Sequence, residues 1–335
     1  MLHIHNGDAS ADRAKQSSLA GEHFAFREAL IEGPTPVGVD AATWRLVRTR
    51  HLWSSYGVDL QQCGQELLAQ EEKLGLFNKH EEVVLWFEHD LFCHVNLIYL
   101  LNWFGKQALE NTKLSMICIN EFPEREDFRG LGELSPEQLA SLFPARKEVT
   151  NAQMELAASA WGAYCSPNPT DIEKVFQTDT SPLSFLNAAL RAHLQRFPAT
   201  GNGLGRIENR AIELIHAGLK NFIDLFFEFG EAEPVYGLGD AQFWLALHRM
   251  SAASKPLLTI EGIEGGGQAK RALTPDVARK ARLEMTALGE SVRKGEADFV
   301  ALNGIDLWLG GVHLNDRKNL WRWNEQSGTL VSGQN

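Results

Sequence analysis

Polar side chains follow several short apolar runs of the chain, and their types suit ligand binding or acid–base chemistry. They are Asn6 and Asp8 after residues 2–5, Arg27 and Glu28 after residues 24–26, Glu88, His89 and Asp90 after residues 82–87, and Asn120 and Glu121 after residues 114–119. Carboxylates that lie together can bind a divalent cation, or act as a general acid and a general base if their pKa values differ. These residues therefore form the first candidate for a functional site.

The elements that must position these residues alternate between strands and helices. Residues 82–87 (EVVLWF) form a nearly continuous apolar run, typical of a strand that is covered on both faces. Helical patterns over 10–19, 44–56, 60–74 and up to 104 separate the apolar runs. The alternation predicts the α/β class, with a small, Rossmann-like and mostly parallel sheet of four or five strands.

Open parallel sheets bind ligands outside the carboxyl ends of their strands. The polar residues after each strand are therefore expected to converge on one edge. The catalytic candidates are Asp8, Glu28, Glu88, His89 and Asp90, and the ligand-binding candidates are Asn6, Gly7, Arg27 and Arg45. Asp8 and Asp90 would act as metal-binding or basic carboxylates, and Glu28 and Glu88 as supporting acids. The alternative is that Asp8 and Asp90 only cap the helices that follow them.

Histidine and cysteine spacing was considered for a metal site. His89 and Cys93 are four residues apart, as are Asp90 and His94, so each pair shares one face of a helix that begins there. The spacing matches no recognised zinc motif, so we assign no metal ligand and no cofactor.

A basic cluster lies on the predicted helix over 44–56. It contains Arg45, Arg48, Arg50 and His51. Guanidinium groups suit phosphate or carboxylate recognition, and Arg27 or Arg45 is the expected anion binder. The alternative is a solvated helix face that balances an acidic chain.

Composition narrows the classes of function. The chain has 335 residues, of which 44% are hydrophobic and 22% charged, and a net charge of −11. This negative charge argues against nucleic-acid binding, although a local basic patch would still allow it. The four cysteines fit no disulfide framework. No signal sequence and no membrane span is expected, so we predict a cytoplasmic protein without a membrane partner.

Three regions are expected along the chain. Residues 1–134 should form the Rossmann-like domain, 135–198 a helical connecting region, and 199–335 a winged-helix-like domain. The last prediction depends on three helices, over 207–216, 222–229 and 240–250, followed by two strands, over 257–260 and 299–302. Trp308, Trp321 and Trp323 could stack on a base or sugar, or fix the C-terminal segment to a small core.

Four ordered motifs resemble one known family. LHIHNGD at the start, FREALIEGP, VVLWFEHDLF and the terminal LNGIDLWLGGVHL with WRW are similar to the bacterial family catalogued as domain of unknown function 1835. A second conserved region usually follows in that family, so the resemblance covers nearly the whole chain. It implies a fold and a bacterial cytoplasmic setting, and no activity. The family has an acid and an amide where this chain has Cys93 and His94.

Three functions remain open from the sequence. The first is binding of, or action on, a small phosphorylated or nucleotide-like ligand at the carboxyl edge of the sheet. The second is a ligand-sensing transcriptional regulator whose winged-helix-like part binds DNA; residues 255–335 hold 11 basic and 10 acidic residues, which is weak support. The third is a protein-interaction scaffold. The sequence assigns neither a reaction nor an oligomeric state.

Overall fold

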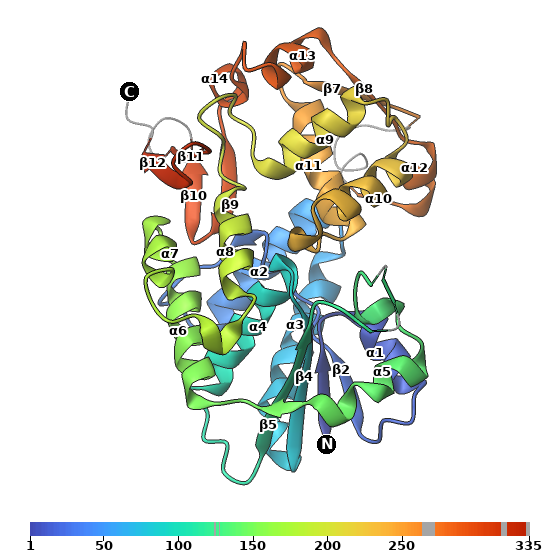
Figure 1. Cartoon of the computed structure of the whole chain (residues 1–335), viewed down its shortest axis with the longest axis vertical. Coiled ribbons are helices and arrows are strands. Elements are labelled where there is room, and N and C mark those ends of the chain that lie inside the picture. The colour runs from blue at the N-terminus through green and yellow to red at the C-terminus, as the bar shows by residue number, and fades with distance from the viewer. Residues whose placement is uncertain (124, 127, 263–271, 316–319, 333–335) are drawn as a thin grey trace.

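A computed structural model describes residues 1–123, 125–126, 128–262, 272–315 and 320–332. It has the mixed α/β architecture predicted from the alternation of strands and helices. The sheet lies in the lower half of Figure 1, and the C-terminal part, coloured yellow to red, lies above the carboxyl ends of its strands.

The main sheet has five strands in the order β2-β1-β4-β5-β6. Their bounds are Leu2–His5 for β1, Glu22–Ala25 for β2, Glu82–Glu88 for β4, Lys113–Ile119 for β5 and Lys147–Glu148 for β6. The first four strands run parallel, and the two-residue β6 pairs with β5 in the antiparallel direction. The prediction of a small, mostly parallel sheet is confirmed.

Strand β4 is central because both of its faces are covered. Val83, Leu85 and Phe87 belong to one hydrophobic cluster, which also contains the apolar face of α4 (Leu91–Phe104). Val84 and Trp86 belong to a second cluster, which includes Ala14 and Leu139 on the opposite side. These contributions come from α1 (Asp8–Lys15) and α5 (Pro136–Ser141). The period of two along the strand thus divides its side chains between two helical layers.

Helix α1 is shorter than the sequence indicated. It begins at Asp8 and ends at Lys15, whereas a helix over 10–19 was expected. The Ser17 hydroxyl donates to the carbonyl oxygen of Ala14 at 2.6 Å and accepts from the Leu19 N–H at 3.1 Å. These side-chain hydrogen bonds favour a turn over another helical turn. The other helices near the sheet are α2 (Ala41–Tyr56) and α3 (Leu60–Gly75).

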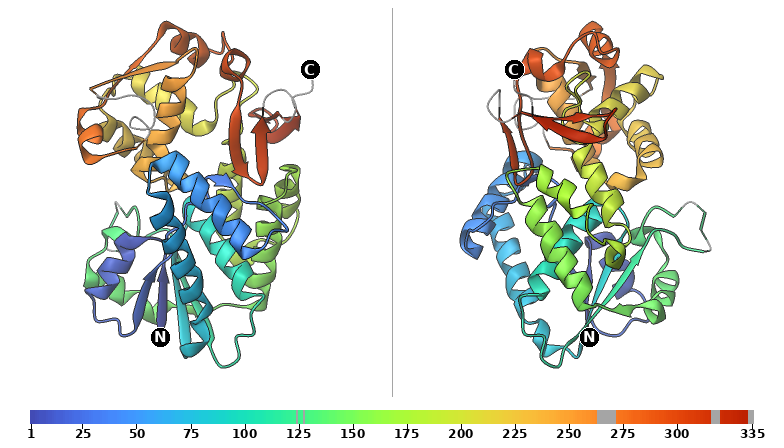
Figure 2. Two further views of the ribbon diagram at one scale, coloured as in Figure 1. Left: turned by 180° about the vertical axis from the view of Figure 1, so that it is seen from behind. Right: turned by 60° about the vertical axis from the view of Figure 1, so that its left-hand side comes forward.

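The helical segment after the sheet packs on α4, and Figure 2 shows it beside the α/β layers. It comprises α6 (Asn151–Tyr164), α7 (Thr170–Val175) and α8 (Leu186–Leu194). A short strand, β3 (Gly33–Pro34), pairs in parallel with β9 (Asp306–Gly310). The N-terminal and C-terminal parts are therefore joined by main-chain hydrogen bonds as well as by packing.

The C-terminal part begins with three helices, as expected, and then departs from the predicted pattern. The helices are α9 (Arg206–His216), α10 (Phe222–Ala232) and α11 (Asp240–Ala252); the later elements are β7 (Leu258–Glu261), α12 (Pro275–Lys280), β8 (Arg282–Met285), α13 (Ala287–Arg293), α14 (Phe299–Asn303), β10 (Val312–Asn315), β11 (Trp321–Asn324) and β12 (Thr329–Ser332). The strand predicted over 299–302 is wrong. The Asp298 carboxylate accepts from the Ala301 N–H at 2.8 Å and caps a helix there. Strand β7 pairs instead with β8.

Candidate functional site

Hydrogen bonds connect the carboxyl ends of β1, β2 and β4. The Asn6 amide nitrogen lies 2.8 Å from the Cys93 sulfur, and the Asn96 amide donates to the Asn6 oxygen at 2.7 Å. The same Asn96 amide donates to the carbonyl oxygen of Glu28 at 2.9 Å. Asn96 is fully buried in α4. This helix, which follows β4, is therefore hydrogen-bonded to the segments that follow β1 and β2.

Glu88, Asp90 and Cys93 form a cluster, called here the acid–thiol cluster. Their ligand atoms all lie within 4.8 Å of one another. Burial, and then the charge of Asp90, raises the pKa of Glu88 to about 8. Burial also raises the pKa of Asp90, and burial with the two carboxylates raises that of the Cys93 thiol. A thiol with a raised pKa is a poor nucleophile, so the cluster lacks the electrostatics of a cysteine-based catalyst.

Each carboxylate of the acid–thiol cluster also has a structural role. One Asp90 oxygen accepts from the Cys93 N–H at 2.8 Å and caps α4, as the capping alternative expected. One Glu88 oxygen accepts from the Leu131 N–H at 2.5 Å. Gly237 packs directly on the Asp90 side chain, so the C-terminal part covers this cluster.

Asp8 is not a helix cap. Gly7 occupies the cap position of α1, with φ at 99°, and Asp8 is the first helical residue. The Asp8 carboxylate pairs with Arg27 at 2.7 Å, and the two side chains are 48% and 58% exposed. This ion pair remains in contact with solvent, so its contribution to stability is small.

The remaining predicted residues are distributed between separate surroundings. Glu28 is buried and binds Arg48 at 2.7 Å. Arg45 pairs instead with Glu71 of α3. The half-buried His89 ring lies 6.0 Å from that of Phe185, and its Nδ1 has no hydrogen-bond partner. The structure thus brings Asn6, Glu88 and Asp90 together around Cys93, whereas Asp8 pairs with Arg27, and Arg45 pairs with Glu71.

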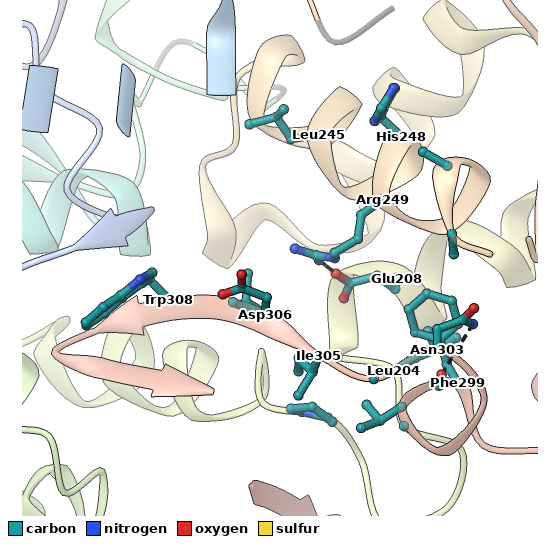
Figure 3. A pocket seen from close by; sticks show the side chains of 18 of the residues that line it. Leu204, Glu208, Leu245, His248, Arg249, Phe299, Asn303, Ile305, Asp306 and Trp308 are labelled. Carbon is teal, nitrogen blue, oxygen red and sulfur yellow. Dashed lines mark hydrogen bonds and ion pairs between the residues drawn. The ribbon is translucent and has the colours of Figure 1, made fainter. Parts of the chain in front are cut away.

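A cavity of about 540 Å3 lies between the N-terminal and C-terminal parts. We call it the interlayer cavity. Its charged and aromatic lining comprises Glu32, His51, Arg196, Glu208, His248, Arg249, Phe299, Asp306 and Trp308. Figure 3 shows the Arg249 guanidinium directed at Glu208, with Trp308 and Asp306 on β9 nearby. The volume is within the range of small-molecule sites.

Two arginines of the interlayer cavity are held by acceptors of the chain. Arg196 is 6% exposed, donates to the carbonyl oxygen of Ile31 at 2.5 Å and lies 3.5 Å from the Glu32 carboxylate. Arg249 pairs with the buried Glu208. Burial lowers the pKa of Arg249, but a guanidinium stays charged at neutral pH. Both positions are therefore fixed cations at the cavity wall.

His51 and Trp308 also line the interlayer cavity. Burial, and then the charge of Arg48, lowers the pKa of His51 to about 3, so its ring is neutral at pH 7. The His51 Nδ1 lies 3.3 Å from the Ser55 hydroxyl, and its Nε2 is buried without a hydrogen-bond partner. The Trp308 ring stacks on His313 with centroids 4.3 Å apart. The cavity thus combines an aromatic surface, fixed cations and an unused imidazole nitrogen.

Sequence reasoning did not select Arg196, Glu208 or Arg249. They lie outside the first 134 residues, on which the strand-end rule concentrates. The available signals were Trp308, whose ring could stack on a base or sugar, and His51 of the basic cluster. Arg48 was part of the noted basic cluster, but the helical pattern did not indicate which arginine of that helix is buried.

Replacing Gly237 by alanine tests the contact that covers the acid–thiol cluster. An added Cβ would collide with the Asp90 carboxyl group, and Gly237 has φ at 58°, which disfavours other residues. We expect a loss of about 2–4 kcal/mol in the free energy of unfolding, measured by urea denaturation. Gly38→Ala is the control, because Gly38 has φ at 70° and open space around it. An equal loss in both variants would contradict close packing on Asp90.

No protein-family model matches the chain, and a search of curated proteins found no match. Among the helices that the structure describes, none is long and apolar enough to cross a membrane. The family resemblance stays a prediction.

Proposed function

We propose that this chain binds a small phosphorylated or nucleotide-like molecule in the interlayer cavity. The observation that carries the proposal is that Arg196, Arg249 and Trp308 line one cavity of about 540 Å3. Most residues that line the cavity belong to the C-terminal part, which lies above the carboxyl ends of the strands (Figure 1), the side where open α/β folds bind ligands. The ligand class is therefore the one expected from the sequence. The proposed site lies in the layer above the strand ends and not at the strand ends themselves.

The chemistry of the lining supports an anionic ligand with a flat portion. Each guanidinium has five N–H donors, and the Glu32 and Glu208 carboxylates use only part of this capacity. A phosphate can accept the remaining N–H groups of Arg196 and Arg249. The aromatic ring of Trp308 supplies a surface on which a base can stack, with a typical contribution of about 1–3 kcal/mol per base.

A ligand screen tests this function. Thermal unfolding is measured with adenosine and guanosine monophosphates, glucose 6-phosphate and inorganic phosphate, and at least one organic phosphate should raise the midpoint. Arg249→Lys keeps a charge beside Glu208 but loses the planar guanidinium, so affinity should fall about 10- to 100-fold. Isothermal titration calorimetry of wild type and variant measures this ratio.

The matched control is Arg45→Lys, because Arg45 also pairs with a glutamate but lies outside the cavity. Its affinity should equal that of the wild type. Trp308→Leu should weaken nucleotide binding more than sugar-phosphate binding, because only the nucleotide stacks. A screen without any midpoint shift, or equal losses in Arg249→Lys and Arg45→Lys, would contradict the proposal.

A second candidate is the ligand-sensing regulator with a winged-helix-like C-terminal part. The specific observation in its favour is the order of three helices, α9, α10 and α11, followed by the antiparallel pair β7 and β8. Retention on immobilised DNA at low salt, lost as salt rises, is the result expected of this function. Absence of retention at low salt would eliminate it and leave the small-ligand proposal unaffected.

A further inference from the structure

We propose that Glu88, Asp90 and Cys93 bind a divalent transition-metal ion, and that zinc is the ion that fits best. The site differs from the interlayer cavity, since none of the three residues lines that cavity. The inference is therefore independent of the proposed ligand-binding function.

The three donors come from one short stretch that joins a strand to a helix. Glu88 ends β4, Asp90 caps α4, and Cys93 lies in the first turn of that helix. Their donor atoms lie within 4.8 Å of one another, and the second Glu88 oxygen is 3.7 Å from the Cys93 sulfur. Each carboxylate binds a main-chain N–H through one named oxygen, which leaves its other oxygen for a metal. Two carboxylate oxygens and a sulfur thus surround one point.

A buried amide on the same helix face as Cys93 has an oxygen without a hydrogen-bond partner. Asn96 is fully buried and follows Cys93 by three residues on α4, so both lie on one face of the helix. Its amide nitrogen donates to Asn6, which contacts Cys93, whereas its Oδ1 has no hydrogen-bond partner. A buried carbonyl oxygen without a donor is costly. This buried oxygen belongs to a side chain that is linked to Cys93 through Asn6, and with the three donors it points to a cation in this region.

Neighbouring groups would hold the ligands in place. The Asn6 amide nitrogen lies 2.8 Å from the Cys93 sulfur and can donate to a thiolate. The Leu131 N–H orients Glu88, and the Cys93 N–H orients Asp90. Such outer contacts fix metal ligands in many proteins. Gly130 and Gly237 pack against the Glu88 and Asp90 carboxyl groups, so two further segments of the chain enclose the site.

The donor set selects the class of metal. A thiolate is a soft ligand that magnesium and calcium do not prefer, whereas zinc accepts sulfur together with carboxylate oxygens. Coordination requires the Cys93 thiolate and the Glu88 carboxylate, so the thiol proton and the Glu88 proton both pass to solvent as the ion binds. The two carboxylates and the thiolate carry three negative charges, which a divalent ion reduces to one.

The test uses cobalt(II) as a spectroscopic substitute for zinc in the full-length chain, after removal of metal with a chelator. We expect binding of one cobalt ion, with a thiolate-to-cobalt charge-transfer band in the near ultraviolet that zinc abolishes by displacement. Zinc alone should raise the thermal midpoint. Asp90→Asn keeps a capping side chain and should weaken cobalt binding at least tenfold.

Cys93→Ser should abolish the charge-transfer band, whereas Cys63→Ser should retain it, because Cys63 is a buried cysteine of α3 outside this cluster. Circular dichroism confirms that each variant is folded. If Cys93→Ser does not fold, the metal-site proposal is tested by the wild-type spectrum and by the cobalt affinity of Asp90→Asn. A folded wild type without the band, a band that survives Cys93→Ser, or unchanged affinity in Asp90→Asn would overturn the proposal. Phosphate-ligand binding in the interlayer cavity is measured separately, so the two proposals fail independently.

Discussion

Replacing Arg48 by alanine is expected to lower the free energy of unfolding by about 3–5 kcal/mol. The Arg48 side chain is 1% exposed and that of Glu28 is 5% exposed. Arg48 donates to one Glu28 oxygen at 2.7 and 3.2 Å, and also to the carbonyl oxygens of Ala29, Glu32 and Pro34. Its removal leaves a buried carboxylate and three carbonyl groups without this donor, and uncompensated charge is the main cost.

Arg45→Ala provides the comparison within the same helix. Arg45 is 23% exposed and pairs with Glu71, which is 33% exposed. Ion pairs that remain in contact with water contribute about 0–1 kcal/mol to stability. Arg45→Ala should therefore lose far less free energy of unfolding than Arg48→Ala. Urea denaturation followed by circular dichroism measures both. Losses of equal size would contradict the assignment of Arg48 as the buried partner.

A double variant separates the ion pair from packing. Arg48→Met with Glu28→Leu removes both charges and keeps apolar volume. It should be more stable than Arg48→Ala, because no buried charge is left unpaired. If the double variant is as unstable as the single one, the carbonyl contacts of Arg48 dominate over its pairing with Glu28.

The fold was predictable where the local signal is strong. The apolar run over 82–87 is covered on both faces, and period and length were sufficient to identify it as a buried strand. Residues 299–302 are a similar short apolar run, yet they form a helix because Asp298 caps it. A run of four apolar residues fits either element, and only the cap distinguishes them.

The candidate site was predictable in part, for physical reasons. Parallel strands end at one edge, so the proximity of Asn6, Glu88 and Asp90 follows from the fold class. Cys93 was noted for its spacing from His89, but its neighbours in space are the two carboxylates. Spacing identifies residues on one helix face and does not indicate what another element places against that face.

The interlayer cavity could not be located from the sequence. Arg196 meets Glu32, and Arg249 meets Glu208, only because the C-terminal part folds over the sheet. Glu32 and Arg196 are far apart in the chain, and each alone resembles an ordinary surface charge. Their burial is a tertiary property, and neither hydrophobic periodicity nor capping signals encode it.

Buried histidines should make this protein unstable in mild acid. His3, His5 and His193 are all fully buried. Burial, with smaller effects from the nearby His23, lowers the pKa of His3 from 6.5 to about 4 and that of His5 to about 2. Burial and the charge of Arg196 lower the pKa of His193 well below 6.5. All three rings are therefore neutral in the folded protein at pH 5 and charged in the unfolded chain.

Other charged groups face these rings and modify the shifts. The N-terminus opposes protonation of His3 and the Glu82 carboxylate favours it, whereas Lys15 opposes protonation of His5. The carboxyl group of Glu88 has the opposite effect on the proton balance. With a pKa of about 8 it holds its proton in the folded protein at pH 5, whereas in the unfolded chain it has largely lost that proton. His51 and His94, whose pKa values burial lowers to about 3 and about 4, add two further protons. Five protons taken up by the unfolded chain, less that of Glu88 and part of that of Asp90, whose pKa is also raised, leave a net uptake of about three to four.

The sign of the effect follows from this balance. The unfolded state binds more protons between about pH 6.5 and pH 4, so the contribution of the histidines to stability is complete above pH 6.5 and is lost as the pH falls through this window. A net uptake of about three to four protons corresponds to about 4–5 kcal/mol per pH unit, a large fraction of the total stability of an ordinary domain. We expect the urea midpoint to fall steeply between pH 6 and pH 5.

A single replacement tests the origin of this slope. His193 packs against the Tyr164 ring, and neither of its ring nitrogens has a hydrogen-bond partner. His193→Met removes one titrating group from an apolar site, so the slope should fall by about one proton, or 1.4 kcal/mol per pH unit. His216→Asn, at a position on α9 whose side chain is 48% exposed, should keep the wild-type slope. Equal slopes in wild type and His193→Met would show that groups other than the buried imidazoles control acid unfolding.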